Sequence, residues 1–190
     1  FLFSGALFTV SEADQVVITR FGKPIGKALV KPGLQFKVPF IDTVNRFDKR
    51  FLAWDGDANQ MVTADKKYIW VDTFARWRIT DPLLFFQKVR NESGAQTRLD
   101  DVIDGATRTA VSSSKLIEMV RSTNDPLDRG MEIEDSELLG ENTALEKVEY
   151  GRSKIQDRIL KLAVQPVAEY GIELLDVRIK RINYVQSVQN

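Results

Sequence analysis

The sequence predicts an α+β domain, with an antiparallel-rich mixed sheet in the N-terminal half, then helices, then a closing strand. Three observations predict it. Residues 68–79 alternate apolar and polar side chains, as a half-buried strand does. Residues 99–110 carry apolar side chains at three- and four-residue steps, which is typical of an amphipathic helix. Residues 175–180 alternate again, so one strand follows the helices.

Strand patterns fill the first half of the chain. Residues 15–21 are rich in β-branched side chains and end at a Gly-Lys-Pro turn signal. Residues 34–40 alternate next, and Pro39 cannot donate to a ladder, so we expect this strand to lie at an edge or to end there. Residues 44–54 are predicted as one further strand, closed by an Asp-Gly-Asp turn. Residues 68–79 form the strongest strand pattern in the chain.

The middle of the chain is predicted to be helical. Asp81 is a natural N-cap and Pro82 suits the first helical position. The apolar stripe that follows indicates a helix packed on a sheet or on another helix, and its members are Leu99, Val102, Ile103, Ala106 and Ala110. A second, short helix is expected at residues 116–120.

The last third begins with residues 132–141, which contain five acidic side chains and no clear period, so we expect an exposed loop there. A long helix is predicted from about residue 144 to Tyr170, kinked or restarted at Pro166. Gly171 stands where a helix C′ glycine belongs. In the closing strand, Leu175, Val177 and Ile179 are expected on one face.

Composition excludes several classes of function. The 190 residues suit one domain, and 27 basic residues balance 27 acidic ones, which argues against nucleic-acid binding. The sequence contains no Cys and no His. Disulfides and thiolate chemistry are therefore impossible, and the commonest general base and transition-metal ligand is missing.

The motifs that could carry chemistry are incomplete. Residues 22–27 have the wrong spacing for a phosphate-binding loop, and residues 55–66 lack the glycine and the final glutamate of a calcium loop. Ser114 and Lys115 could form a Ser–Lys hydrolytic dyad, which needs a buried lysine beside the serine. Serines between two helices more often serve as caps, so we favour that interpretation. We expect no catalytic residue, no metal site and no cofactor.

One apolar strand face has two interpretations. Leu34, Phe36, Val38 and Phe40 alternate with polar residues. The interpretation we favour is that they pack in the domain core, because apolar strand faces usually point inward. The alternative is a membrane-facing surface that inserts shallowly into the lipid interface, with lysines at headgroup level.

Several segments, in this order along nearly the whole chain, resemble the SPFH family, also called band 7 or prohibitin-homology. They are Arg20-Phe21-Gly22-Lys23, the run from Lys31-Pro32-Gly33 to Phe40-Ile41-Asp42, Arg76-Trp77-Arg78-Ile79-Thr80-Asp81-Pro82, and Tyr170-Gly171-Ile172 with Asp176-Val177-Arg178-Ile179-Lys180. The combination is most similar to the bacterial HflC branch of that family.

The resemblance implies a non-enzymatic membrane scaffold. Proteins of this branch assemble with HflK-like subunits into large hetero-oligomers and modulate the membrane AAA+ protease FtsH. It also implies contact with membrane lipids and a single-pass location in the bacterial inner membrane, with the domain on the periplasmic face. Residues 1–8 are then the end of an N-terminal anchor, 9–185 the SPFH domain, and 186–190 the start of a truncated C-terminal segment that leads to a coiled coil.

Other interpretations of the same residues stay open. Residues 1–8 are too few to span a bilayer, and by residue type alone they also suit a buried first strand. A stomatin-like lipid-binding scaffold without a protease partner is the main alternative function. A Ser–Lys hydrolase is the more distant one.

Overall fold

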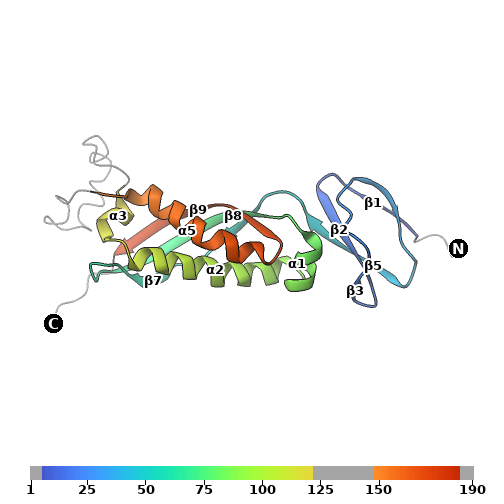
Figure 1. Ribbon diagram of the computed structural model, residues 1–190, viewed down its shortest axis with the longest axis horizontal. Coiled ribbons are helices and arrows are strands. Elements are labelled where there is room, and N and C mark those ends of the chain that lie inside the picture. Colours follow the sequence, from blue (N-terminus) through green and yellow to red (C-terminus); the bar gives the residue numbers. More distant parts are fainter. Residues whose placement is uncertain (1–5, 122–147, 185–190) are drawn as a thin grey trace.

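The computed structural model describes residues 6–121 and 148–184. The molecule is elongated, with its N-terminal strands at one end (Figure 1). Helices cover one face of a longer sheet along the rest of its length, and the C-terminal end lies at the opposite pole. The α+β fold class predicted from the sequence is confirmed.

The N-terminal end is built from five strands in two small antiparallel sheets. The first is a ribbon of β1 (Leu7–Val10) and β4 (Gly33–Phe36), and the second has the order β3–β2–β5. Here β2 is Asp14–Arg20, β3 is Lys23–Pro24 and β5 is Asp42–Asp48. We call residues 6–50 the N-terminal unit.

The main sheet is centred on β8 (Tyr68–Ile79), which has the bounds expected from its alternation. Strands β6 (Leu52–Asp55) and β7 (Asn59–Val62) pair with its two halves along one edge. The closing strand β9 (Ile172–Tyr184) pairs antiparallel with the whole of β8 along the other edge. The inward face of β8 is buried as predicted, from Ile69 through Trp77 to Ile79.

Within residues 6–121 and 148–184, four helices cover that inward face. Helix α1 (Pro82–Lys88) begins at the predicted N-cap, where the Asp81 carboxylate accepts from the amides of Leu83 and Leu84. Helix α2 (Glu92–Ser112) buries the predicted stripe, including Leu99, Ile103 and Ala110. The short α3 (Leu116–Val120) and the long α5 (Gly151–Ala168) complete the layer.

The predicted left-handed glycine after the long helix is confirmed, Pro166 does not restart that helix, and the helix starts later than predicted. Gly171 adopts a φ of +73° just after α5, as a C′ glycine does. Pro166 lies inside α5. Among the described residues α5 begins at Gly151 rather than near 144; residues 144–147, like the predicted acidic loop 132–141, lie outside the described residues.

Three strand predictions need correction. Residues 44–54 are not one strand but belong to β5 and β6, which pair in different sheets. The Asp48 carboxylate accepts from the backbone amide of Arg50 at 2.8 Å, and this local bond accompanies the turn between them. The strand at 34–40 stops at Phe36, before Pro39. In β9, the register shift beside Trp77 leaves Leu175 half-buried and places Leu174 in the core.

Candidate functional site

The N-terminal unit exposes large apolar side chains to an unusual degree. Phe40 is 94% exposed, Phe21 85%, Leu34 66%, and Leu7 and Phe36 each 61%. In the described remainder of the chain, only Tyr150 at 64% and Phe51 at 57% come close to these values. Scattered apolar side chains on a surface are ordinary, whereas a concentration at one pole of a molecule indicates a contact surface.

The β1–β4 ribbon presents three of these side chains on one face. In its register Leu7 lies opposite Phe36, and Thr9 lies opposite Leu34. Directly opposed residues of an antiparallel pair share a face, so Leu7, Leu34 and Phe36 point the same way. The other face carries Val10, which is buried. The ribbon therefore carries apolar side chains on both faces, and those of its outward face are exposed to solvent.

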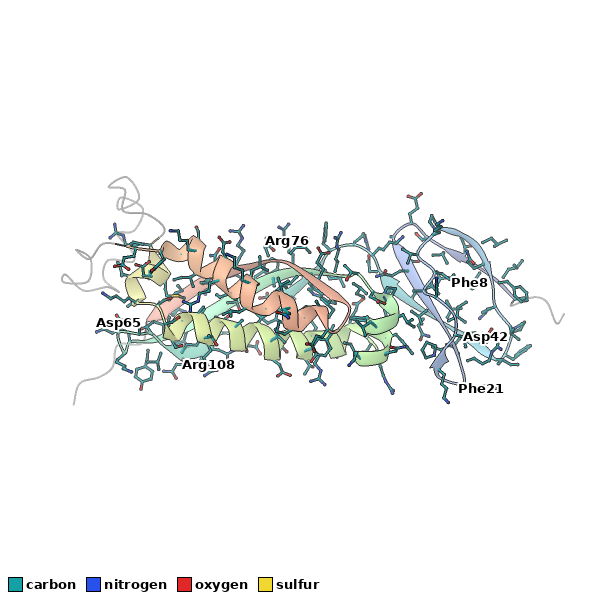
Figure 2. The ribbon with its side chains drawn as sticks, in the orientation of Figure 1. Phe8, Phe21, Asp42, Asp65, Arg76 and Arg108 are labelled. Atoms are coloured by element: carbon teal, nitrogen blue, oxygen red, sulfur yellow. The ribbon has the colours of Figure 1, made fainter. Side chains whose placement is uncertain are left out.

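Phe21 lies at the tip of the β2–β3 hairpin, at one edge of the N-terminal unit (Figure 2). Phe21 and Gly22 adopt φ values of +50° and +79°, so both central residues of this two-residue turn are left-handed. Such a turn favours Asn-Gly, and a bulky side chain in this conformation costs about 1–2 kcal/mol. Backbone strain of this kind concentrates at functional sites. Phe21 is strained and projects into solvent.

The loop between β4 and β5 presents Phe40 in a similar way. Phe40 has a φ of +66°, and the neighbouring Ile41 is 41% exposed. The loop is held at its base by Asp42, which is 8% exposed. We call Leu7, Phe21, Leu34, Phe36, Phe40 and Ile41 together the apolar tip.

Asp42 fixes the base of this loop through three hydrogen bonds to its carboxylate. Arg20 donates from Nε at 2.8 Å and from Nη2 at 3.1 Å, and the Val38 amide donates at 2.9 Å. The hydrogen bond from Arg20, followed by the one from the Val38 amide, lowers the pKa of Asp42 below its usual range. The carboxylate therefore joins the hairpin of Phe21 to the loop of Phe40.

The N-terminal unit is attached to the main sheet by buried contacts. The Gln15 amide donates to the carbonyl of Ile79 at 3.0 Å, and Gln15 itself is buried. Phe47 packs edge-on against Phe85 of α1, with 5.3 Å between ring centroids. These contacts join the unit to the helical layer while the apolar tip stays in solvent.

The preferred sequence interpretation of residues 34–40 is wrong, because their alternating apolar face is not in the core. Leu34, Phe36 and Phe40 are exposed and Val38 is half-buried. Sequence reasoning also missed Phe21, Leu7 and Ile41 as members of the same surface. For Phe21 the sequence did indicate exposure, because a side chain at the centre of a tight hairpin turn points away from the strands and has no neighbour to pack against.

The Ser–Lys hypothesis lacks its structural requirement. Lys115 is exposed, whereas a lysine that acts as a base in such a dyad must be buried. The Ser114 hydroxyl donates to the carbonyl of Ala110 at 2.8 Å, as serines at helix ends do. Both residues line a cavity of about 490 Å³ between α3 and the start of α5.

The buried carboxylate beside this cavity has a structural partner. Glu118 accepts from the backbone amides of Glu149 at 2.6 Å and Tyr150 at 2.8 Å, and also from that of Gly151. Burial alone would raise the pKa of Glu118, but these three amides hold it below the usual range. Glu118 therefore caps the first turn of α5.

Two acidic residues of α2, Asp100 and Asp104, accept hydrogen bonds from side chains of the main sheet. The Asp100 carboxylate accepts from the Trp54 indole at 2.6 Å, and the Asp104 carboxylate accepts from Asn59 at 2.7 Å. These bonds join α2 to β6 and β7. No group of three or more carboxylates within residues 6–121 and 148–184 has the arrangement of a metal site.

Comparison with known proteins agrees with the fold and with the resemblance noted in the sequence. The sequence pattern of the SPFH domain / Band 7 family matches residues 8–190. The chain belongs to the SPFH family. Among curated relatives, the HflC proteins of Borreliella burgdorferi and Treponema pallidum are 33% and 31% identical over 97% and 96% of the chain. The Escherichia coli K12 protein named modulator of FtsH protease HflC is 32% identical over 94%.

The chain spans 57–59% of the length of these three SPFH relatives. None of the helices described here is long and apolar enough to cross a membrane. Of residues 1–8, which sequence analysis assigned to the end of an anchor, Leu7 and Phe8 lie in β1 and residues 1–5 fall outside the described part. The apolar tip thus belongs to an SPFH domain and includes Leu7 of β1, the first strand of the described chain.

Proposed function

We propose that this chain is the membrane-adjacent domain of an HflC-type scaffold that modulates an FtsH-type membrane protease without catalysis of its own. The observation that carries the proposal is the similarity to HflC proteins, including one named for modulating FtsH, along at least 94% of the chain. An HflK-like subunit is the proposed partner in a large hetero-oligomer. The proposed location is the bacterial inner membrane, single-pass, with the domain on the periplasmic face.

In this proposal the apolar tip lies in the lipid interface. An aromatic side chain moved from water into an apolar environment gains about 1.5–3 kcal/mol, so two or three exposed side chains suffice for a marked preference. The lipid-facing backbone must still be paired. In the β1–β4 ribbon and the β2–β3 hairpin, many backbone groups are already paired by hydrogen bonds between the strands, which favours shallow insertion of side chains. Residues 1–8 as the end of an anchor would place the same pole at the membrane.

Affinity purification of the whole gene product from detergent-solubilised native membranes tests the proposal. We expect an HflK-like protein and an ATP-dependent membrane protease to co-purify, and deletion of the gene to alter turnover of that protease's substrates. Reproducible recovery of lipids without either protein would contradict the protease role. That outcome would favour a stomatin-like lipid scaffold, for which the exposed apolar tip is equally suited.

A Ser–Lys hydrolase is not favoured by the geometry around Ser114. Replacing Ser112, Ser113 and Ser114 with alanine in the whole gene product tests this directly. The scaffold proposal expects protease modulation to be retained, because the serine hydroxyls bond to backbone carbonyls of their own helix.

A further inference from the structure

The N-terminal unit is basic although the whole chain is neutral. Residues 6–50 contain eight basic residues and four acidic ones, an excess of four positive charges. The negative charge that balances the chain belongs to residues 122–147, which carry eight acidic and two basic side chains and lie outside the described residues. A local excess of positive charge raises the rate of encounter with a surface of opposite charge.

Three of the four carboxylates in this unit are already paired within it. Asp42 bonds Arg20, Asp14 lies 3.3 Å from Arg46, and Asp48 lies 2.8 Å from Arg50. The fourth is the exposed Glu12. These pairs use arginines, so the positive excess of the unit belongs to its lysines.

The lysines lie in the turns and loops of the same N-terminal unit, and Lys27 and Lys31 belong to the connection between β3 and β4, which leads into the strand of Leu34 and Phe36. No ion pair is recorded in the described part of the chain for any of the five; Lys49 donates to the carbonyl of Val30, which leaves Lys23, Lys27, Lys31 and Lys37. Lys23 begins β3 directly after the Phe21 turn, and Lys37 follows Phe36. Lys37 lies close enough to Asp42 to lower the pKa of that carboxyl, so its charge is partly committed. The remaining three are exposed.

Exposed aromatic side chains interleaved with exposed lysines suit one kind of partner. Lysine stems lie along apolar surface while their ammonium groups stay at the level of the headgroups. An apolar surface with lysines beside it binds a bilayer more strongly when the headgroups are anionic. A protein partner would need acidic residues around an apolar pocket, and nothing in the described chain requires one.

We infer that the apolar tip and its lysines bind the surface of an anionic phospholipid bilayer and discriminate against zwitterionic headgroups. The inference rests on the proposed membrane contact of this domain and adds the class of lipid. Lys23, Lys27 and Lys31 supply the discrimination, and the apolar tip supplies binding that is common to all bilayers. Each lysine near an anionic surface strengthens binding about fivefold.

Vesicle co-sedimentation of the 190-residue chain tests this inference. The probes are vesicles of phosphatidylcholine alone and of phosphatidylcholine with an equimolar amount of phosphatidylglycerol. We expect the chain to bind the anionic vesicles about a hundredfold more strongly. The difference should shrink as salt is added, because screening at 0.1 M salt acts over about 10 Å.

Two charge-matched variants assign the effect to the tip. The triple variant Lys23→Gln, Lys27→Gln and Lys31→Gln should lose about a hundredfold of its binding to anionic vesicles and keep its weak binding to phosphatidylcholine. The control replaces Lys66, Lys67 and Lys161 with Gln; all three are exposed and lie outside the N-terminal unit. It should bind like the wild type. Circular dichroism and thermal unfolding verify that both variants are folded.

The possible results distinguish lipid selectivity from membrane contact as such. Equal binding to both vesicle types would overturn the lipid selectivity while leaving the membrane contact in place. An equal loss in the control variant would overturn the assignment to these three lysines. Absence of binding to any vesicle by the folded chain would contradict the membrane contact itself, and the selectivity with it.

Discussion

Replacing Phe21 with Asn should make the protein more stable and weaken its membrane binding. The residue occupies the first central position of a two-residue turn at φ +50°, where an L-residue other than Asn, Asp or Gly is strained. Its side chain is 85% exposed, so little packing is lost when the ring is removed. Asn-Gly is a favoured pair for this turn. We therefore expect a gain of about 1 kcal/mol in the free energy of unfolding.

Urea and thermal denaturation measure the first half of this prediction. For a chain of this size, 1 kcal/mol raises the melting temperature by about 2–4 °C. Phe51→Asn is the matched control: it removes another exposed ring, but one at a negative φ that lies over the Arg78 guanidinium, 5.5 Å from ring centroid to Cζ. The control should show no gain. Unchanged or reduced stability of Phe21→Asn would refute the reasoning from turn strain.

Vesicle binding measures the second half. Removing one inserted aromatic ring should weaken binding about 10- to 100-fold, which corresponds to ~1.5–3 kcal/mol. Tyr150→Asn removes an exposed ring from the residue before α5, far from the tip, and should leave binding unchanged. If Phe21→Asn binds vesicles as the wild type does, Phe21 is not part of the membrane contact.

Three further substitutions test the contacts that hold the site and the fold. Asp42→Asn should lower the free energy of unfolding at neutral pH. Because the pKa of Asp42 is lower in the folded state, the stability that its charge contributes is present above the unfolded pKa near 4 and is lost as pH falls through the folded pKa. Urea titrations at several pH values should therefore show a smaller loss of stability in acid for the variant than for the wild type. Glu118→Gln weakens the cap of α5, and we expect the free energy of unfolding to fall by about 1–3 kcal/mol. Amide hydrogen exchange at residues 149–151 should become faster, and unchanged exchange would contradict the capping role. Gly171→Ala would place a Cβ at a φ of +73° and against the Asp81 carbonyl oxygen, so its melting temperature should fall by several degrees; a melting temperature within a degree of wild type would contradict this expectation.

The parts of the fold that the sequence predicted well are those where local chemistry and burial agree. Strand β8 alternates over its full length because one face is buried and the other is not. The N-cap at Asp81 and the C′ glycine at Gly171 are defined by backbone geometry, and few residue types satisfy them. In such places the residue type itself carries the structural information.

The errors arise where a tertiary contact decides. The break between β5 and β6 contains no glycine or proline, so the sequence offered no turn signal there. The position of Leu175 depends on a register shift against β8, which changes the phase of the alternation; because residues 174 and 175 are both leucine, the sequence does not indicate which of them faces the core.

The candidate site illustrates a different limit. Alternation at Leu34 and Phe36 establishes that one strand face is apolar. The sequence pattern does not differ between a face that packs in a protein core and one that contacts a bilayer. The strand pairing and exposure in the structure decide that it is not covered within the described chain. The family resemblance, by contrast, was fully readable from short motifs in order, because those motifs include the turns and caps that the fold requires.

Site-specific fluorescence of the whole gene product in its membrane tests the central claim most directly. The 190-residue chain has no cysteine, so within it Phe40→Cys and Lys67→Cys each provide one site for an environment-sensitive dye. We expect a blue-shifted emission at position 40 that lipid-borne nitroxides quench, and a water-exposed emission at position 67. Water-exposed, unquenched emission at both positions would contradict a membrane-facing apolar tip.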